Sequence, residues 1–201
     1  MDDWTAEGDY EQIEQTGLEL TDVSAPGARF LDCRLTSSAI SGGDLGGTTW
    51  RGGGLSGVRF VGTHLARSVW HGVELDNCAL SGVELFGASW RRLILRGGML
   101  QGVNLRQSRL EDVVFEDCVL RDVDFGAATL ERVRFPGCRI ERVDLTAMTA
   151  RRVDLRGAQV TIARGLDRLR GVVIDHAQLM DLAPAMAVQL GLEVRAVGED
   201  D

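Results

Sequence analysis

Large apolar residues recur at every fifth position along most of the chain. From Leu20 to Leu155 these 28 positions hold 16 Leu, 5 Phe, 3 Trp, 2 Ile and 2 Ala, and none of them is polar. Two positions earlier in each unit the residue is small or β-branched, most often Val or Cys. Two positions after the large residue Gly recurs, with Asp, Asn or Arg in most other units. Self-similarity at a fixed period indicates a repeat architecture.

Neither a helix nor a flat strand explains a period of five. An α-helix repeats about every 3.6 residues and a strand every 2, so neither brings each fifth side chain to one face. A chain that turns by about 90° every five residues does so, and four units then close a roughly square coil. Both apolar positions point inward, and successive coils pair as parallel strands about 4.8 Å apart. Gly, Asn and Asp suit the corners because they tolerate the backbone angles of tight turns.

The individual units resemble the pentapeptide-repeat family, whose usual unit is A(D/N)LXX. Good matches are Val-Asn-Leu at 103–105, Val-Asp-Phe at 123–125 and Val-Asp-Leu at 143–145, and the resemblance covers about residues 18–157. It implies an all-β solenoid, a right-handed quadrilateral parallel β-helix of about seven coils over residues 18–160. Residues 1–17 are then expected to form an N-terminal cap, because a solenoid needs its open ends covered.

Residues one full coil apart should stack on the same face. This places Phe30, Trp50, Trp70, Trp90 and Leu110 in one ladder. An aromatic column of this kind could serve as a ligand surface, but the inward phase favours interior packing.

One segment departs from the pattern. In 91–95, Leu93 occupies a small position and Ile94 lies beside it, while Phe86 and Met99 fall in outward positions. Either the coil bulges here or an apolar patch is exposed, and an exposed patch would bind a partner.

The five-residue period ends near residue 160, and residues 161–201 predict a link, a helix and a tail that cap the rod or join two chains. Asp175 and Gln178 have the spacing of a capping box, and Gly191 suits the helix end. Pro184 should kink the helix or begin a second one. The apolar face predicted for this helix is Leu179, Leu182, Met186 and Leu190. Relatives suggested by the resemblance dimerise through C-terminal helices or strands, so a homodimer is expected alongside the alternative of a simple cap.

The sequence contains no arrangement typical of catalysis or metal binding. The four cysteines, Cys33, Cys78, Cys118 and Cys138, all take the small inward position and lack the spacing of a zinc site. The three histidines have no neighbouring Ser or Cys that suggests a triad, and the Gly-rich pieces follow the repeat rather than a phosphate loop. We therefore expect no catalytic residues, no metal, no cofactor and no enzyme.

The net charge of −8 is distributed unevenly, and all 22 basic residues are Arg. Residues 1–30 hold 8 acids and 1 base, whereas residues 31–110 hold 5 acids and 9 bases. One outward column in the basic middle reads Arg51, His71, Arg91. The candidate partner surface combines the outward apolar residues with nearby carboxylates: Phe86, Ile94, Met99, Glu111, Asp112, Glu116, Asp117 and Glu131.

The acidic N-terminus has no apolar stretch, and no apolar run approaches the roughly 20 residues of a membrane helix. A cytoplasmic protein without a signal peptide or membrane contact is the expectation.

Three functions are consistent with these features. The first is a non-enzymatic protein-binding scaffold with an unknown partner. The second follows from the resemblance, because some family members mimic DNA and bind DNA gyrase, which gives quinolone or gyrase-poison protection. The uninterrupted rod looks like the compact mycobacterial type, but residues 18–157 hold 17 acids and 18 bases, whereas a DNA mimic should be acidic. The third, weak nucleic-acid binding through Arg51, His71 and Arg91, is opposed by the acidic total.

Overall fold

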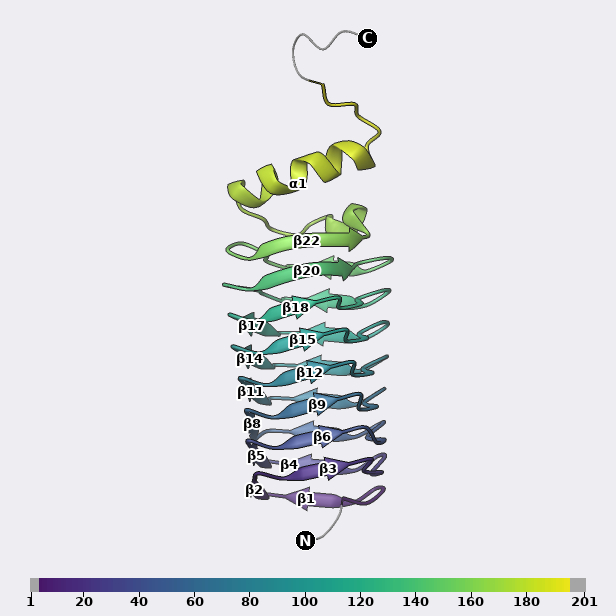
Figure 1. The fold of residues 1–201 in the computed structure, drawn as a ribbon, viewed down its shortest axis with the longest axis vertical. Coiled ribbons are helices and arrows are strands. Elements are labelled where there is room, and N and C mark those ends of the chain that lie inside the picture. Colours follow the sequence, from purple (N-terminus) through teal and green to yellow (C-terminus); the bar gives the residue numbers. More distant parts are fainter. Residues whose placement is uncertain (1–3, 196–201) are drawn as a thin grey trace.

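The computed structural model describes residues 4–195 as a stack of β-coils crossed at its C-terminal end by one α-helix (Figure 1). Each coil has four sides, and residues twenty apart in sequence pair in parallel, as Trp50 does with Trp70. We call the sides faces 1 to 4 in chain order. The two ends of the described chain lie at opposite ends of the stack (Figure 1).

Three faces are continuous parallel sheets. Face 1 has eight strands: β1 (Asp9–Glu11), β4 (Arg29–Leu31), β7 (Thr49–Arg51), β10 (Val69–His71), β13 (Ser89–Arg91), β16 (Arg109–Glu111), β19 (Thr129–Glu131) and β21 (Thr149–Arg151). Face 2 has six: β2 (Glu14–Thr16), β5 (Arg34–Thr36), β8 (Gly54–Ser56), β11 (Glu74–Asp76), β14 (Ile94–Arg96) and β17 (Val114–Glu116). Face 3 has eight: β3 (Glu19–Thr21), β6 (Ala39–Ser41), β9 (Arg59–Val61), β12 (Ala79–Ser81), β15 (Met99–Gln101), β18 (Val119–Arg121), β20 (Arg139–Asp144) and β22 (Gln159–Arg164).

Face 4 is held by single-residue bridges instead of strands. The bridges connect Ser24, Asp44, His64, Glu84, Asn104, Asp124 and Asp144, one in each coil. Together the four faces confirm the quadrilateral solenoid predicted from the five-residue period.

The coil begins at Asp9 rather than at residue 18, so β1 and β2 lie inside the segment expected to form the N-terminal cap. This adds one turn to the seven that the repeat indicated, and face 1 accordingly has eight strands. Tyr10 takes the large inward position and Trp4 is buried against the first coils. The Trp4 ring lies edge-on to Phe30, with 4.7 Å between centroids.

The corners confirm the role of the Gly-rich position. Every fifth residue from Glu7 to Gly157 has a positive φ, between 47° and 78°. Gly43 and Gly53, in the small inward position, also have positive φ. A Cβ at Gly53 would lie 2.0 Å from the carbonyl oxygen of Cys33, so the close approach of two coils requires glycine there.

The segment 91–95 does not bulge. Strands β13 and β14 keep an unbroken register with the coils on both sides, and Leu93 is fully buried. The register shifts between β20 and β22 instead, where the five-residue period is lost.

After the coils, a short 3-10 helix (Leu166–Leu169) leads to α1 (His176–Gln189), which lies across the end of the stack (Figure 1). The capping box is present as predicted, because the Gln178 N–H donates to Asp175 and the Asp175 N–H donates to the Gln178 side chain. Helix α1 continues through Pro184, so no second helix begins there. No helix within residues 4–195 has the length and apolar character to cross a membrane.

Candidate functional site

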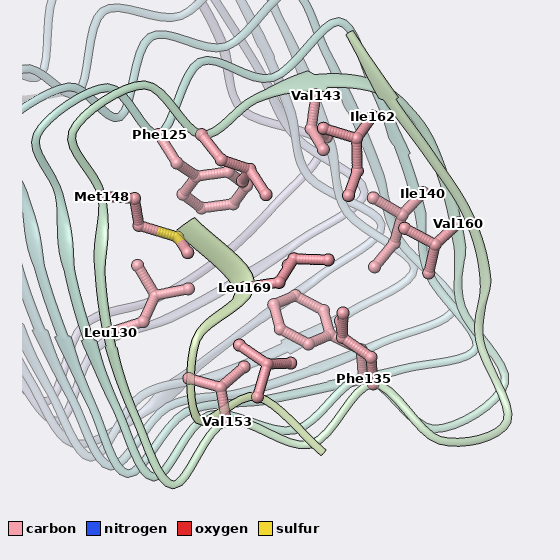
Figure 2. Close-up of a pocket in the computed structure, with 13 residues that line it drawn as sticks. Phe125, Leu130, Phe135, Ile140, Val143, Met148, Val153, Val160, Ile162 and Leu169 are labelled. Atoms are coloured by element: carbon pink, nitrogen blue, oxygen red, sulfur yellow. The ribbon is translucent and has the colours of Figure 1, made fainter. Parts of the chain in front are cut away.

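The interior of the described solenoid is largely apolar. A void of about 30 Å³ lies under the C-terminal end, where Leu169 of the 3-10 helix points into it (Figure 2). All the side chains around it are hydrocarbon or thioether, among them Phe125, Phe135 and Met148. A void of this size holds at most about one water, and it offers no side-chain polar partner. It is a packing defect at the end of the repeat.

The aromatic ladder lies inside the rod. Phe30, Trp50, Trp70 and Trp90 are each at most 3% exposed, and Leu110 is fully buried. The Phe30 and Trp50 rings stack with 3.9 Å between centroids, and Trp50 and Trp70 follow at 5.0 Å. These rings therefore stabilise the early coils by packing and present no surface to a ligand.

The cysteines are buried, free thiols. Burial raises the pKa of Cys78 to about 11, so its thiol is protonated near neutrality. Cys118 and Cys138 lie in adjacent coils, where the Cys118 N–H donates to the sulfur of Cys138. Within residues 4–195 no group of His, Cys, Asp and Glu is arranged to hold a metal ion.

The predicted apolar partner patch is divided among three faces. Phe86 lies on face 4, Ile94 on face 2 and Met99 on face 3. Phe86 and Met99 are 37% and 44% exposed, whereas Ile94 is half-buried between neighbouring strands. These three residues do not form one continuous surface, because the chain turns a corner between them.

The predicted acidic surface is largely neutralised by arginine. Arg132 forms ion pairs with Glu111, Asp112 and Glu131, which together surround its guanidinium. Hydrogen bonding to Arg132 holds the pKa of Asp112 below its usual value and raises that of Arg132. These carboxylates therefore do not form a free acidic face.

The two other predicted acids lie on a different part of the rod. Glu116 lies 3.4 Å from Arg96 on face 2. Asp117 lies at the next corner, with its carboxylate over the Cα of Gly137 in the following coil.

Charge pairing between successive coils is the general arrangement of the rod. Within the described residues nine ion pairs join an Arg to an acid exactly one coil away: Asp9–Arg29, Glu14–Arg34, Asp76–Arg96, Arg91–Glu111, Arg96–Glu116, Asp112–Arg132, Arg121–Glu141, Asp122–Arg142 and Asp144–Arg164. Each exposed pair contributes about 0–1 kcal/mol, and their regular spacing also favours the correct register. The sequence showed the columns but not which of them would pair.

The column Arg51, His71, Arg91 follows this arrangement only at its upper end. The three residues are direct neighbours in β7, β10 and β13. Within residues 4–195 Arg51 has no ion-pair partner, whereas Arg91 pairs with Glu111 of the next coil at 3.9 Å. The structure therefore brings these predicted residues together on face 1.

Helix α1 exposes most of its apolar side chains. Of the predicted face, Leu182 is buried, Met186 is half-buried, and Leu179 and Leu190 are 43% and 74% exposed. Met180, Val188, Leu192 and Val194 are also well exposed at this end of the molecule.

The side chain of Gln178 attaches the helix to the last coil. This side chain is buried, and its amide donates to the carbonyl oxygens of Leu155 and Ala158. Sequence reasoning assigned Gln178 to the capping box alone and missed its contact with the coil.

Comparison with known proteins agrees with the repetitive coil. The family model for the pentapeptide repeat region matches residues 68–145 and 88–163. The chain belongs to the pentapeptide-repeat family.

Solved structures of pentapeptide-repeat proteins match most of the chain at low sequence identity. A trypsin-treated variant of QnrB1, a plasmid-mediated fluoroquinolone resistance protein, is 17% identical, with 91% of this chain and 100% of that chain covered and a TM-score of 0.46. Another match is HetL, a pentapeptide-repeat protein involved in heterocyst differentiation regulation in the cyanobacterium Nostoc sp. strain PCC 7120. It is 17% identical to this chain, and the match covers 84% of this chain and 92% of HetL with a TM-score of 0.29. No curated protein sequence matches the chain.

Proposed function

We propose that this protein is a non-enzymatic protein-binding scaffold whose C-terminal end associates with a second copy of the chain. The observation that carries the proposal is the concentration of exposed apolar side chains on α1 and just beyond it. Val188 is 78% exposed and Met180 is 63% exposed, and Leu190, Leu192 and Val194 are at least 60% exposed. Several exposed apolar side chains gathered at one end of a protein are typical of an interface.

The rest of the rod supports this assignment. Its exposed large apolar residues, such as Val61 and Phe86, are scattered over different faces. Its charged side chains are used largely in pairs between coils, and its described interior is largely apolar. A helix that lies across the end of a rod can pack on the same helix of a second rod about a two-fold axis, so that both apolar faces are covered at once.

The oligomeric state tests this proposal. Sedimentation equilibrium of the full chain should give twice the chain mass of 21.9 kDa. Met180→Asp together with Val188→Asp should give a monomer, because each buries a charge in the interface. Val61→Asp, at an exposed valine on face 3, is the matched control and should remain dimeric. A monomeric wild-type protein at high concentration would show that α1 does not join two copies.

A second candidate function is DNA mimicry toward DNA gyrase or another topoisomerase, with protection against quinolones or gyrase poisons. An unbroken rod of eight turns favours it, and the register of the described coils has no inserted loop up to β20. The pairing of Glu111, Asp112 and Glu131 with Arg132 opposes it. Supercoiling by purified gyrase, with and without a quinolone, tests the idea. Inhibition or rescue that is lost in Glu111→Gln with Asp112→Asn would support it.

Weak nucleic-acid binding through Arg51, His71 and Arg91 is the third candidate. It is favoured by the column of these residues on face 1. The net charge of −8 opposes it, because a polyanion is repelled by the acidic ends of the chain.

A further inference from the structure

Face 1 carries a positive area that the folded chain neutralises only at its upper edge, where Glu111 lies 3.9 Å from Arg91. Arg51, His71 and Arg91 follow one another in adjacent coils, about 5 Å apart along the rod. Many other arginines stack on an acid one coil away, as Arg132 does on Asp112. Arg51 has no such partner within residues 4–195, so its charge contributes no ion pair to the stability of the rod.

Two further arginines widen this area. Arg92 occupies the corner beside Arg91, and Arg109 lies in β16, one coil above Ser89. Both are exposed, and within residues 4–195 neither has a carboxylate within ion-pair distance. Arg29, by comparison, is bound through two hydrogen bonds to Asp9. We call Arg51, His71, Arg91, Arg92 and Arg109 the cationic face.

The surface between these side chains is partly apolar. The outward column beside Arg51 and His71 holds Thr49, Val69 and Ser89, which have short side chains. Val69 is 37% exposed at its centre. The corners next to Arg51 and His71 are Gly52 and Gly72, which add no side chain. A ligand can therefore approach the guanidinium groups and contact a valine at the same time.

We propose that the cationic face docks a short acidic segment of a partner protein, with an apolar side chain of that segment against Val69. Carboxylates bind arginine through charge-assisted, two-pronged hydrogen bonds. The cationic face lies on the side of the rod, apart from α1. Binding there is therefore a second interaction, separate from the end-to-end contact proposed above.

The boundaries of the cationic face favour a protein segment over nucleic acid. Glu11 and Asp32 lie below it, and Glu111 and Glu131 lie above it in the same or the adjacent column. Arg51 and Arg91 are two coils apart, which is about 10 Å. A duplex carries one charge per roughly 1.7 Å and would extend over the acids at both ends. A peptide of a few residues fits between them.

Fluorescence anisotropy with two labelled probes tests the proposal on the full-length protein. One probe is a short peptide of Asp and Glu with Leu at its centre, and the other is an oligothymidine with the same number of charges. Arg51→Glu with Arg91→Glu is the test variant. Arg59→Glu with Arg139→Glu, two exposed arginines on face 3, changes the net charge equally and is the control. Circular dichroism checks that the test variant and the control are folded. If the test variant is unfolded, Arg51→Gln with Arg91→Gln replaces it.

The proposal predicts saturable binding of the peptide that weakens as salt rises. The test variant should lose about tenfold or more in affinity, and the control should lose less than about twofold. No saturable binding at low salt would overturn it, as would equal losses in both variants, which would indicate only bulk charge. Tighter binding of the oligothymidine through the same arginines would also overturn it, because the face would then recognise nucleic acid. The Met180→Asp, Val188→Asp variant should bind the peptide as the wild type does, so this proposal and the proposed dimer can fail separately.

Discussion

The indole N–H of Trp70 donates a 2.9 Å hydrogen bond to the hydroxyl of Ser68, two residues earlier in the chain. One coil below, Trp50 donates to Thr48 in the same way, at 3.3 Å. One coil above, the residue in this position is Ala88, and the buried indole N–H of Trp90 has no partner. In the coils of Trp50 and Trp70, the residue at the small inward position therefore accepts a hydrogen bond from the indole two residues later. In the coil of Trp90, Ala88 cannot do so.

Replacement of Ala88 by Ser should stabilise the protein. The new hydroxyl would accept from Trp90, which satisfies a buried donor and contributes about 1 kcal/mol. Urea unfolding followed by far-UV circular dichroism measures the change. Ala128→Ser, in the same column but followed by Leu130, is the control and should give no gain. Equal effects of the two substitutions would contradict the assignment of a missing partner at Trp90.

Two glycines with the same sign of φ should respond differently to alanine. Gly47 and Gly53 both have positive φ, but a Cβ at Gly47 meets nothing within 4 Å. Gly47→Ala should therefore cost about 1–2 kcal/mol, from backbone strain alone. Gly53→Ala adds a clash with the Cys33 carbonyl at 2.0 Å and should cost roughly 3 kcal/mol or more. Thermal unfolding of both variants tests whether Gly53→Ala costs more stability than Gly47→Ala. Equal losses of stability would contradict the prediction.

Stability should depend on pH through Arg132. The pKa of Asp112 is lowered by its hydrogen bond to this arginine, so the interaction is complete above the ordinary Asp value and is lost as pH falls through the folded value. Arg132→Gln should melt at a lower temperature than the wild type at pH 7. The difference should shrink as pH falls below the ordinary Asp value, because Asp112 is then progressively protonated.

Arg109→Gln provides the matched control for that experiment, since Arg109 is an exposed arginine on the same side of the rod. Its melting temperature should change little at pH 7 or in acid. A loss for Arg132→Gln that persisted in acid would show that the arginine acts through packing rather than charge.

The attachment of α1 should depend on Gln178. Gln178→Glu keeps the size of the side chain but removes the amide that donates to Leu155 and Ala158, and it puts an acid against two carbonyl oxygens. Undocking of the helix should become easier by roughly 1–3 kcal/mol. Hydrogen exchange of α1 amides should be faster, while amides of the early coils keep their rates. Gln189→Glu, on the exposed end of the same helix, should leave exchange of the first helical turn unchanged.

The periodic part of the fold could be predicted in detail because each unit meets the same surroundings. The position of Trp70 one coil above Trp50, the inward cysteines and the left-handed corners all follow from a repeat of five and a coil of twenty. The same arithmetic separates Phe86, Ile94 and Met99, since these positions belong to different sides of the square. The prediction grouped these residues because they are close in sequence and did not take the corners into account. The corners place them on different faces, so they do not form one patch.

The ends could not be predicted equally well, because there the chain has no neighbouring coil to repeat. The first coil begins at Asp9, where Trp4 supplies the apolar cover that a preceding coil would give. At the other end, the buried contact of Gln178 with the last coil depends on how α1 lies across it, and no local pattern encodes that direction. The 3-10 helix that brings Leu169 over the core has no counterpart in the repeat.

By itself, then, the sequence determined the coil, its inward columns and the helix cap at Asp175, because these depend on spacing within a few residues. Only the tertiary structure decided which charges are neutralised. Arg132 forms ion pairs with three carboxylates, whereas Arg51 forms none within the described residues. The difference lies in the length and direction of the side chains around the corners. It also decided that most apolar residues of α1 face outward, since one helix covers the end of a rod with only part of its circumference.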